Sequence, residues 1–517
     1  MSRNAAVVVS VALALTACGN PKDAEGWARR AAGRSRLDEK LAALAEVRKA
    51  PGDRRAAVPH LVEILKDGDA HPRAKGEAAV ALGEIGDPAA APELVKVIRP
   101  EARERDVVDA NRHAADALGV LRAREAVPKL QELLTRSPDG FAQVAAVDAL
   151  GRIGDPAAVD TLLAVVKGDR VEPFTARKAL LALGRIGDPR ATETVLRMLF
   201  EERPGVSFFP EASFAAVQIG RPMAGPLLAV LEGKDVKLSE WARERRILPG
   251  ALYAKSAQLL GDVGGEEAVP ALVRKLTYQD ADAGIAMFVR VFAAESLGRM
   301  RARGAVRPLA DLLAKEKDPN VRDRYCDALV RIGDPAALAA LRAASQAGAW
   351  DQREGALTAL SRLGGEGERA VVEQARAKDC APGCPPAMKG AFARMTARLD
   401  AAKGCSDAAC WARRLADPAA AVRDRAALEV GRAGGAAHAA ALGEAAVRPV
   451  NDDADLAARY HAVLALAWIA GRDKLADGPA IADKIDAMLA QDRGRTLTAG
   501  VNEDAFRLAT KLRRAGR

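Results

Sequence analysis

The chain has 517 residues, six cysteines and a formal net charge of +9. Hydrophobic residues make up 49% of it and aromatic residues only 4%, which excludes disorder for most of the chain and favours packed helices over a β-sandwich. So few cysteines exclude a fold that depends on a disulfide framework, and the modest basic excess permits an anionic partner without requiring one.

The first predicted element is a secretory signal at residues 1–17. Arg3 makes its start positive, and an apolar run from Ala5 to Leu15 follows that is too short to span a bilayer. The tetrapeptide Leu-Thr-Ala-Cys, which ends at Cys18, resembles the lipobox of bacterial lipoproteins. The resemblance implies that Cys18 is lipidated and becomes the first mature residue, and two or more acyl chains give stable anchoring. The alternative is an ordinary signal with an incidental Cys, although Leu15 stands where such signals favour a small residue.

The residues after Cys18 predict how the anchored chain continues. Gly19 is not the Asp that resembles an inner-membrane retention signal, so the lipoprotein resemblance implies the outer membrane of a bacterial cell envelope. Residues 18–36 hold Gly, Pro, Lys and Asp with little periodicity, which predicts a tether. No later segment approaches eighteen uninterrupted apolar residues, so we expect no transmembrane helix in the mature chain.

An internal repeat begins near residue 37 and decides the fold class. The octapeptide Ala-Leu-Gly-Glu-Ile-Gly-Asp-Pro at 81–88 returns with small changes at 149–156, 182–189 and 328–335. Aligned on the first Gly position, the copies fall mostly 31 to 37 residues apart, at 83, 119, 151, 184, 217, 261, 298, 330, 361, 431 and 467.

Each copy predicts two helices joined by a sharp turn. Leu150 and Gly151 follow Val147 at i+3 and i+4, which places them on one face of a first helix, where Gly lets a neighbouring helix approach closely. Gly154 then ends this helix in the left-handed conformation, and Asp155 caps a second helix that begins with Pro156. One such hairpin cannot bury its apolar face alone, so the hairpins are expected to stack.

Arginines mark two further features of the repeat. Arg122 and Arg301 stand where the copies at 119 and 298 lack the turn Gly, so we expect looser turns there. Other arginines recur at the ends of the first helices, where they complement the helix dipole and form either a ladder with the Asp caps or a basic stripe for an acidic partner. These are Arg152, Arg185, Arg299, Arg331, Arg362 and Arg432.

The pattern resembles the HEAT-like repeats of the phycobilisome-lyase type over residues 37–375 and 412–475. The resemblance implies an all-α fold, an α-α superhelical solenoid of about eleven or twelve helical hairpins. It also implies that the second helices line a concave surface that receives a partner. Residues 37–375 are then one solenoid, and 412–517 hold the last repeats and capping helices.

The longest departure from the repeat inside the first segment lies between positions 217 and 261, which are 44 residues apart. Its extra residues, 234–249, place a Trp among arginines, and a Phe pair stands just before, in a loop bounded by prolines. Aromatic and Arg side chains provide large contact area at interfaces. The candidate partner-binding residues are Phe208, Phe209, Trp241, Arg243, Arg245 and Arg246, unless they pack onto the solenoid as a local core.

Residues 376–411 are expected to be a cysteine-containing degenerate repeat or an insertion. The spacings CxxxC and CxxxxC lack the tighter CxxC of zinc sites, and an exported protein is expected to oxidise its cysteines. We predict no metal and two disulfides, either local or crossed, among Cys380, Cys384, Cys405 and Cys410. Cys326 stands where other copies have Ala, so we expect a small buried residue there.

The sequence contains no recognisable catalytic or cofactor motif. Its five histidines form no HExxH pair, and neither a Gly-rich phosphate loop nor a GxSxG elbow is present. We therefore expect a non-enzymatic scaffold that binds a protein partner and needs no cofactor. The alternatives are a bilin-lyase-like enzyme, because similar repeats occur in such lyases, and a binder of an anionic polymer through a basic surface. Export and scarce aromatic residues disfavour nucleic acid.

Overall fold

The computed structural model describes residues 21–168, 171–203, 205–346, 348–381 and 383–515. The predicted signal at 1–17 and the predicted anchor, Cys18, lie outside these ranges. The chain divides into two compact units: unit 1 runs up to Thr194 and includes Arg203–Ala215, and unit 2 comprises Val195–Glu202 and Ala216–Arg517. The division falls inside residues 37–375, which the sequence predicted to be one solenoid.

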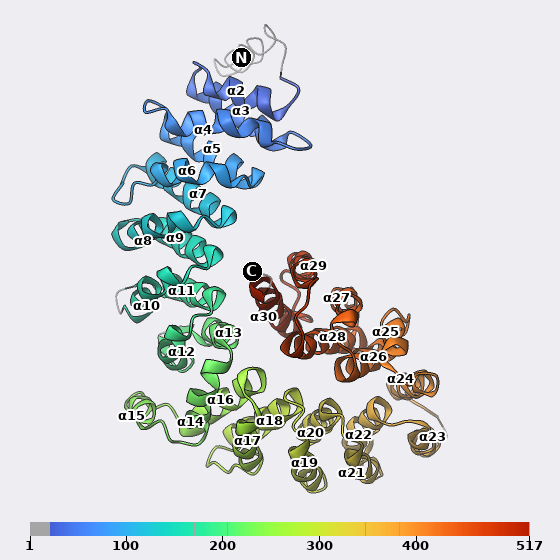
Figure 1. The fold of residues 1–517 in the computed structure, drawn as a ribbon. Helices are drawn as coiled ribbons and strands as arrows, with labels where there is room; N and C mark the ends of the chain where they lie inside the picture. Colours follow the sequence, from blue (N-terminus) through green and yellow to red (C-terminus); the bar gives the residue numbers. More distant parts are fainter. Residues whose placement is uncertain (1–20, 169–170, 204, 347, 382, 516–517) are drawn as a thin grey trace, which may run out of the picture. The chain divides into compact units, whose positions relative to one another are not determined.

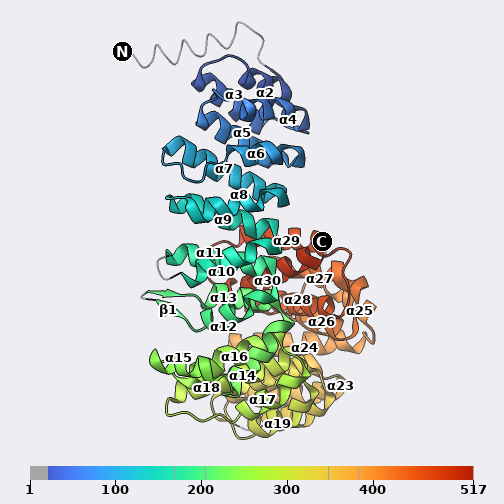
Figure 2. The same ribbon diagram turned by 60° about the vertical axis from the view of Figure 1, so that its left-hand side comes forward.

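Unit 1 is a stack of helical hairpins (Figures 1 and 2). Its first helices are α3 (Leu37–Lys49), α5 (Pro72–Ile85), α7 (Arg105–Leu121), α9 (Gly140–Ile153) and α11 (Pro173–Ile186). Its second helices are α4 (Val58–Lys66), α6 (Ala91–Val97), α8 (Val127–Arg136) and α10 (Val159–Lys167). The division between the units passes through α12 (Thr192–Met198), the strand pair β1 (Glu202–Arg203) and β2 (Val206–Ser207), and α13 (Phe209–Ile219).

Unit 2 continues the series of hairpins. Its first helices are α16 (Pro249–Val263), α18 (Ala283–Arg299), α20 (Pro319–Ile332), α22 (Trp350–Leu363), α24 (Pro386–Lys403), α26 (Ala420–Ala433) and α28 (Asp453–Arg472). Its second helices are α14 (Ala224–Leu231), α17 (Val269–Lys275), α19 (Val306–Leu313), α21 (Leu338–Ala344), α23 (Glu366–Asp379), α25 (Ala408–Arg414), α27 (Ala439–Ala446) and α29 (Gly478–Gln491). Two helices stand outside the hairpins, α15 (Val236–Glu244) and α30 (Ala499–Ala515).

These elements confirm the all-α solenoid. Two hairpins, α3–α4 and α24–α25, extend the series beyond the copies found by aligning the glycines. The predicted degenerate repeat, 376–411, runs from the end of α23 into α25, so it overlaps the second of these hairpins. Most hairpins carry a 3-10 turn between their helices. These turns are η1 (Arg55–Ala57), η2 (Pro88–Ala90), η3 (Arg124–Ala126), η4 (Pro156–Ala158), η5 (Pro189–Ala191), η6 (Arg221–Met223), η7 (Glu266–Ala268), η8 (Arg303–Ala305), η9 (Pro335–Ala337) and η10 (Ala436–His438).

The turns of the full motif have the predicted geometry. Gly86, Gly154, Gly187 and Gly333 adopt φ values of 79°, 73°, 68° and 72° after the first helix. Asp155 then accepts a hydrogen bond from the Ala157 amide at 2.9 Å. This Asp caps the 3-10 turn rather than the second helix itself, which follows it directly.

The turns that lack Gly are not looser, contrary to expectation. Arg122 and Arg301 adopt φ values of 53° and 55°, so each occupies the same left-handed position as the Gly of the other copies. After α7 the Ala123 amide donates to the Leu118 carbonyl at 3.1 Å, which closes the turn. An L-residue in this conformation costs roughly 1–2 kcal/mol.

Successive first helices approach one another very closely. A Cβ on Gly119 would lie 2.8 Å from the Ala149 Cα, and one on Gly151 would lie 2.9 Å from the Ala182 Cα. Real Cβ atoms essentially never make such contacts, so Gly is required on one helix and a small residue on the next. This is the close approach that the repeated Gly predicted.

The first helices, and not the second helices, form the inner layer of unit 2 (Figure 1). In Figure 1, α18, α20 and α22 lie inside α17, α19 and α21. The same small-residue contacts explain this correction, since a Cβ on Gly298 would lie 2.9 Å from the Ala328 Cα. The closely packed layer is the shorter one, and the unit curves toward it.

Unit 2 also closes on itself, because its C-terminal helices return to its first hairpins. The Trp468 indole on α28 donates to the Arg299 carbonyl at the end of α18, at 2.8 Å. Arg299 also pairs with Asp504 on α30, with 3.0 Å between Nη2 and Oδ2. The Gln218 side-chain amide donates to the Arg507 carbonyl at 2.7 Å. The inner layer of this unit therefore faces its own C-terminal helices.

The tether predicted at 18–36 is wrong for residues 24–32. Residues 24–32 form α2 (Ala24–Ala32), which Asp23 caps by accepting from the Gly26 amide at 2.8 Å. Ala28 and Ala31 are fully buried. Small side chains that recur at helical spacing form an apolar face here, which a composition of Gly, Pro and charged residues concealed.

Within the described part of the chain, no single helix is long and apolar enough to cross a membrane. Two consecutive helical segments, Phe209–Ile219 and Arg221–Leu231, are long and apolar enough when taken together, but the chain bends by 114° between them. Phe214 and Leu227 of this pair are buried in the fold.

Candidate functional site

Two exposed aromatic side chains stand on successive first helices of unit 1. Phe141 begins α9 and Phe174 begins α11, each ten residues before the aligned Gly of its repeat. Their exposed fractions are 70% and 56%. Exposed apolar side chains that adjoin one another mark interaction surfaces, and a few large side chains carry most of the binding energy at interfaces. We call these two side chains the aromatic pair.

The same repeat position is aromatic once more in unit 2. Phe288 stands ten residues before Gly298 and is 51% exposed. Its ring stacks on that of Phe292, one helical turn further along α18, with 6.0 Å between the centroids. The sequence contained this recurrence, but the aromatic pair was not among the candidate residues that we took from it.

Charged groups surround the aromatic pair but are themselves paired. The Arg112 guanidinium lies 5.4 Å from the centroid of the Phe141 ring, and the Lys178 ammonium lies 5.7 Å from that of Phe174. Lys178 is also 2.9 Å from Asp148. Because these cations already have carboxylate or ring partners, the exposed apolar rings are the feature left available to a partner.

The arginine ladder exists in part, and the partners across it are not the Asp caps, whereas Arg331 and Arg432 pair with carboxylates of their own helices. Arg152 pairs with Asp116 at 4.0 Å, and Arg362 pairs with Asp327 at 3.2 Å. In both cases the carboxylate comes from the preceding first helix, three residues before the aligned position. The Asp caps lie beyond the end of the first helix, whereas neighbouring first helices run side by side, so the carboxylates on those helices are within reach.

The two Phe side chains predicted to bind a partner are largely buried in unit 1. Phe208 is fully buried, so its ring belongs to the core and not to a contact surface. Arg203 covers it, with the guanidinium carbon 5.1 Å from the ring centroid. Phe209 is half-buried at the start of α13. The alternative of a local core therefore describes Phe208.

The other predicted cluster forms α15 and the turn that follows it in unit 2. Trp241 is partly buried between two guanidinium groups, with Arg197 at 5.1 Å and Arg245 at 4.6 Å from its ring. Arg243, Arg245 and Arg246 are exposed, and Arg246 has a φ of 58°. These arginines lie together on one exposed turn, in a different unit from Phe208 and Phe209.

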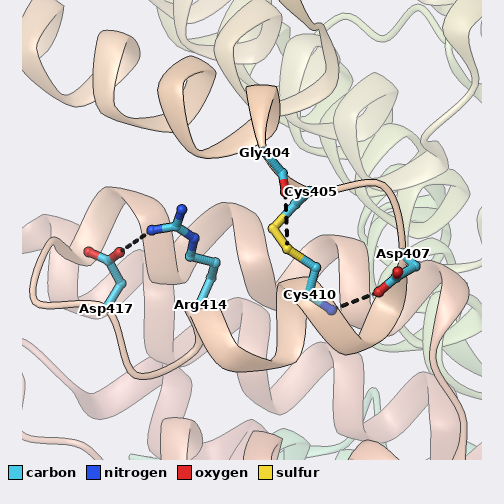
Figure 3. The surroundings of a disulfide bond; sticks show 6 residues. All are labelled: Gly404, Cys405, Asp407, Cys410, Arg414 and Asp417. Atoms are coloured by element: carbon cyan, nitrogen blue, oxygen red, sulfur yellow. Dashed lines mark hydrogen bonds and ion pairs between the residues drawn. A yellow bond between two sulfur atoms is a disulfide. The ribbon is translucent and has the colours of Figure 1, made fainter.

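One disulfide closes the turn between α24 and α25 (Figure 3). It joins Cys405 to Cys410, and Asp407 between them accepts from the Cys410 amide at 2.7 Å. Figure 3 also shows the pair formed by Arg414 and Asp417, 3.3 Å apart, at the end of the same short helix. The bond links the turn after α24 to the first turn of the short helix α25.

The second disulfide joins Cys380 to Cys384 after α23. Of the two predicted alternatives, local or crossed, the structure therefore has the local pairing. Among the described residues no group of three or more His, Cys, Asp or Glu side chains is arranged to hold a metal ion. Cys326 is buried, and burial raises the pKa of its thiol well above the usual value.

A buried charged cluster in unit 2 is the largest feature that sequence reasoning missed. Asp424 on α26 is fully buried and accepts from Arg362 on α22 at 2.8 Å and from Arg398 on α24 at 3.0 Å. Its other oxygen contacts Nδ1 of His461 on α28. Four successive first helices thus share one carboxylate.

The protonation states in this cluster follow from burial and charge. Burial opposes ionisation of Asp424, but the two guanidinium groups outweigh it and hold the pKa of this carboxyl well below its usual value. Burial lowers the pKa of His461, although Asp424 opposes that shift. At neutral pH the imidazole is therefore uncharged, and it must donate from Nδ1 because the ionised Asp424 can only accept.

Further buried arginines in unit 2 hydrogen-bond to the backbone. Four first helices carry a buried Arg eight residues before the aligned position, and each donates to backbone carbonyls of the preceding turn, for example Arg322 to Leu313 at 2.8 Å. The four are Arg322, Arg353, Arg423 and Arg459. These four arginines therefore serve inside the fold and do not add to a basic surface.

Comparison with known families supports the repeat. The family described as HEAT repeats matches residues 100–176, 286–361 and 306–382, and the PBS lyase HEAT-like repeat matches residues 74–99. The chain therefore contains HEAT-like repeats in both units. No curated protein matches the sequence.

The chain is also similar to several solved structures, at low TM-scores. Human deoxyhypusine hydroxylase in complex with glycerol is 23% identical, with a TM-score of 0.22 over 54% of this chain and 97% of that chain. Importin beta is 13% identical, with a TM-score of 0.37 over 93% of this chain and 75% of that chain. These likenesses concern the fold alone.

Proposed function

We propose that this chain is a non-enzymatic scaffold of the bacterial cell envelope that binds a protein partner on the first-helix layer of unit 1. The observation that carries the proposal is the aromatic pair, Phe141 and Phe174, exposed at the same position of two successive repeats. Solenoids of stacked repeats present extended concave surfaces that these proteins use for binding.

The arrangement of the rings indicates what the partner presents. Packed helices lie about 8–10 Å apart, so rings at one repeat position on α9 and α11 are separated by roughly that distance. Two apolar side chains seven residues apart on a helix span about 10.5 Å. The partner segment that fits is therefore an amphipathic helix whose apolar stripe packs on both rings.

Anchoring by acyl chains on Cys18, at the outer membrane, belongs to the same proposal. Its support is the tetrapeptide that ends at Cys18, with Gly19 after it. Mass spectrometry of the N-terminal peptide from membrane-extracted protein tests it directly. We expect a diacylglyceryl thioether on Cys18 and release of the Cys18→Ser protein from the membrane; an unmodified Cys18 in a membrane-bound chain would contradict the anchor.

Photo-crosslinking in native cells tests the binding surface. A photoreactive phenylalanine analogue at position 141 or 174 is expected to yield one discrete crosslinked partner. The matched control carries the analogue at Asp160 on α10 of the same repeat, which is 80% exposed but belongs to the second-helix layer. The proposal fails if all three positions give the same products, or if none gives a product.

The rings can then be removed one at a time. Hot-spot side chains contribute at least about 2 kcal/mol, so Phe141→Ala and Phe174→Ala are each expected to weaken binding of the captured partner by more than about tenfold. Both rings are exposed, so folding should be unchanged. The arginines of the α15 turn remain a second candidate contact, and Arg243→Ala with Arg245→Ala is the corresponding variant.

A further inference from the structure

A small cavity opens in unit 2 above the buried charged cluster. It has a volume of about 300 Å³ and lies between the second half of α22, the middle of α24 and the start of α28. Small-molecule sites begin at roughly this volume. Its polar lining is contributed by Thr358, Arg362, Arg394, Arg398, Asp452 and Asp453.

One side of the cavity is cationic. Arg362 and Arg398 are held from behind by Asp424, which fixes the orientation of both guanidinium groups. Arg394, one turn before Arg398 on α24, is exposed and has no hydrogen bond or ion pair with the described residues. Its five N–H donors are therefore available to an anionic group.

The lining contributed by the start of α28 is acidic. Asp452 caps α28 by accepting from the Asp455 amide at 2.8 Å. Asp453, the first residue of that helix, lines the cavity and has no partner among the described residues. Ala391, Ala454 and Ala457 form the apolar part of the lining.

We propose that this cavity binds a small zwitterion, a free amino acid or short peptide, whose carboxylate pairs with Arg394 and Arg362 and whose ammonium pairs with Asp453. A ligand that carried only negative charge would meet the carboxylates of α28, and one that carried only positive charge would meet the guanidinium groups. A ligand with both charges satisfies both sides at once. The assignment is independent of the partner surface in unit 1.

Calorimetric titration of the full-length protein with triglycine and its blocked forms tests the charge requirement. We expect triglycine to bind, and N-acetyl-triglycine and triglycine amide each to bind at least about tenfold more weakly, because a charge-assisted hydrogen bond is worth about 1.5–3 kcal/mol. The doubly blocked peptide should not bind. Equal binding of all four, or no binding of triglycine, would overturn the proposal.

Substitutions locate the site. Arg394→Ala should reduce affinity for triglycine and triglycine amide to similar values, since it removes the carboxylate partner, and Asp453→Asn should do the same for triglycine and N-acetyl-triglycine. Arg413→Ala on α25 and Asp311→Asn on α19 are exposed controls and should leave affinity unchanged. Unchanged affinity in the Arg394 and Asp453 variants would show that the peptide binds elsewhere.

Discussion

The two units place the same repeat position in opposite environments. The Arg that follows the aligned position is 44% exposed at Arg152 in unit 1 but 8% at Arg331 and 11% at Arg362 in unit 2. In unit 1 this Arg belongs to a surface ladder. In unit 2 the returning helices cover it, so its charge requires a buried partner. The environment of a repeat position therefore depends on whether other helices of the unit cover the layer of first helices.

The largest expected effect separates these two environments directly. Asp424→Asn leaves the guanidinium groups of Arg362 and Arg398 buried without a carboxylate, and breaking a buried pair in this way costs about 3–5 kcal/mol. The matched change in unit 1, Asp116→Asn, removes the partner of the exposed Arg152 and should cost less than about 1 kcal/mol. Urea denaturation followed by circular dichroism measures both.

If both substitutions lowered the free energy of unfolding by the same small amount, the cluster would not be a distinct stabilising feature of unit 2. Asp424→Ala provides a second variant for this test, because it also removes the hydrogen-bonding amide that Asn would retain.

The close approach of first helices can be broken in the same way. Gly151→Ala places a Cβ 2.9 Å from the Ala182 Cα, and overpacking of this kind costs about 1–3 kcal/mol. Gly140→Ala, at the start of the same helix, has no atom within 4 Å of the new Cβ and should be neutral or slightly stabilising. The denaturant midpoints of the two variants should therefore move apart; coincident midpoints would contradict the packing argument.

The pH dependence of stability reports on the buried imidazole. The pKa of His461 is lowered in the folded protein, so below its unfolded value of 6.5 the unfolded chain binds a proton that the folded chain does not. Stability should fall as the pH drops below about 6.5, by at most about 1.4 kcal/mol for each pH unit. His461→Asn retains a donor toward Asp424 without a titrating ring and should show a shallower slope; parallel curves would contradict this account.

The smallest effect concerns the turns. Arg122 is exposed and holds a left-handed φ, so Arg122→Gly should stabilise unit 1 by about 1 kcal/mol. The reciprocal change, Gly154→Ala, should destabilise it by about the same amount, because Gly154 has a φ of 73°. A thermal melt of each variant decides this, and shifts in the same direction would be inconsistent with the shared turn geometry.

Local chemistry determined most of the secondary structure. The motif at 149–156 specifies a helix, a left-handed Gly, an Asp cap and a Pro within eight residues, and each of these depends only on neighbours along the chain. The repeat spacing then implied stacking, because a single hairpin exposes an apolar face. α2 was missed because its apolar face is made of Ala alone.

Tertiary structure decided which of these residues are available for function. Phe141 and Phe208 are both aromatic residues near the start of a first helix, yet one is 70% exposed and the other fully buried. Asp424 and Arg362 are 62 residues apart in the chain, and Trp468 reaches the Arg299 carbonyl across 169 residues. The first contact follows from the packing of α22, α24 and α26 around one carboxylate, and the second from the return of α28 across unit 2. Short-range patterns do not contain that return, because it depends on the accumulated geometry of many hairpins.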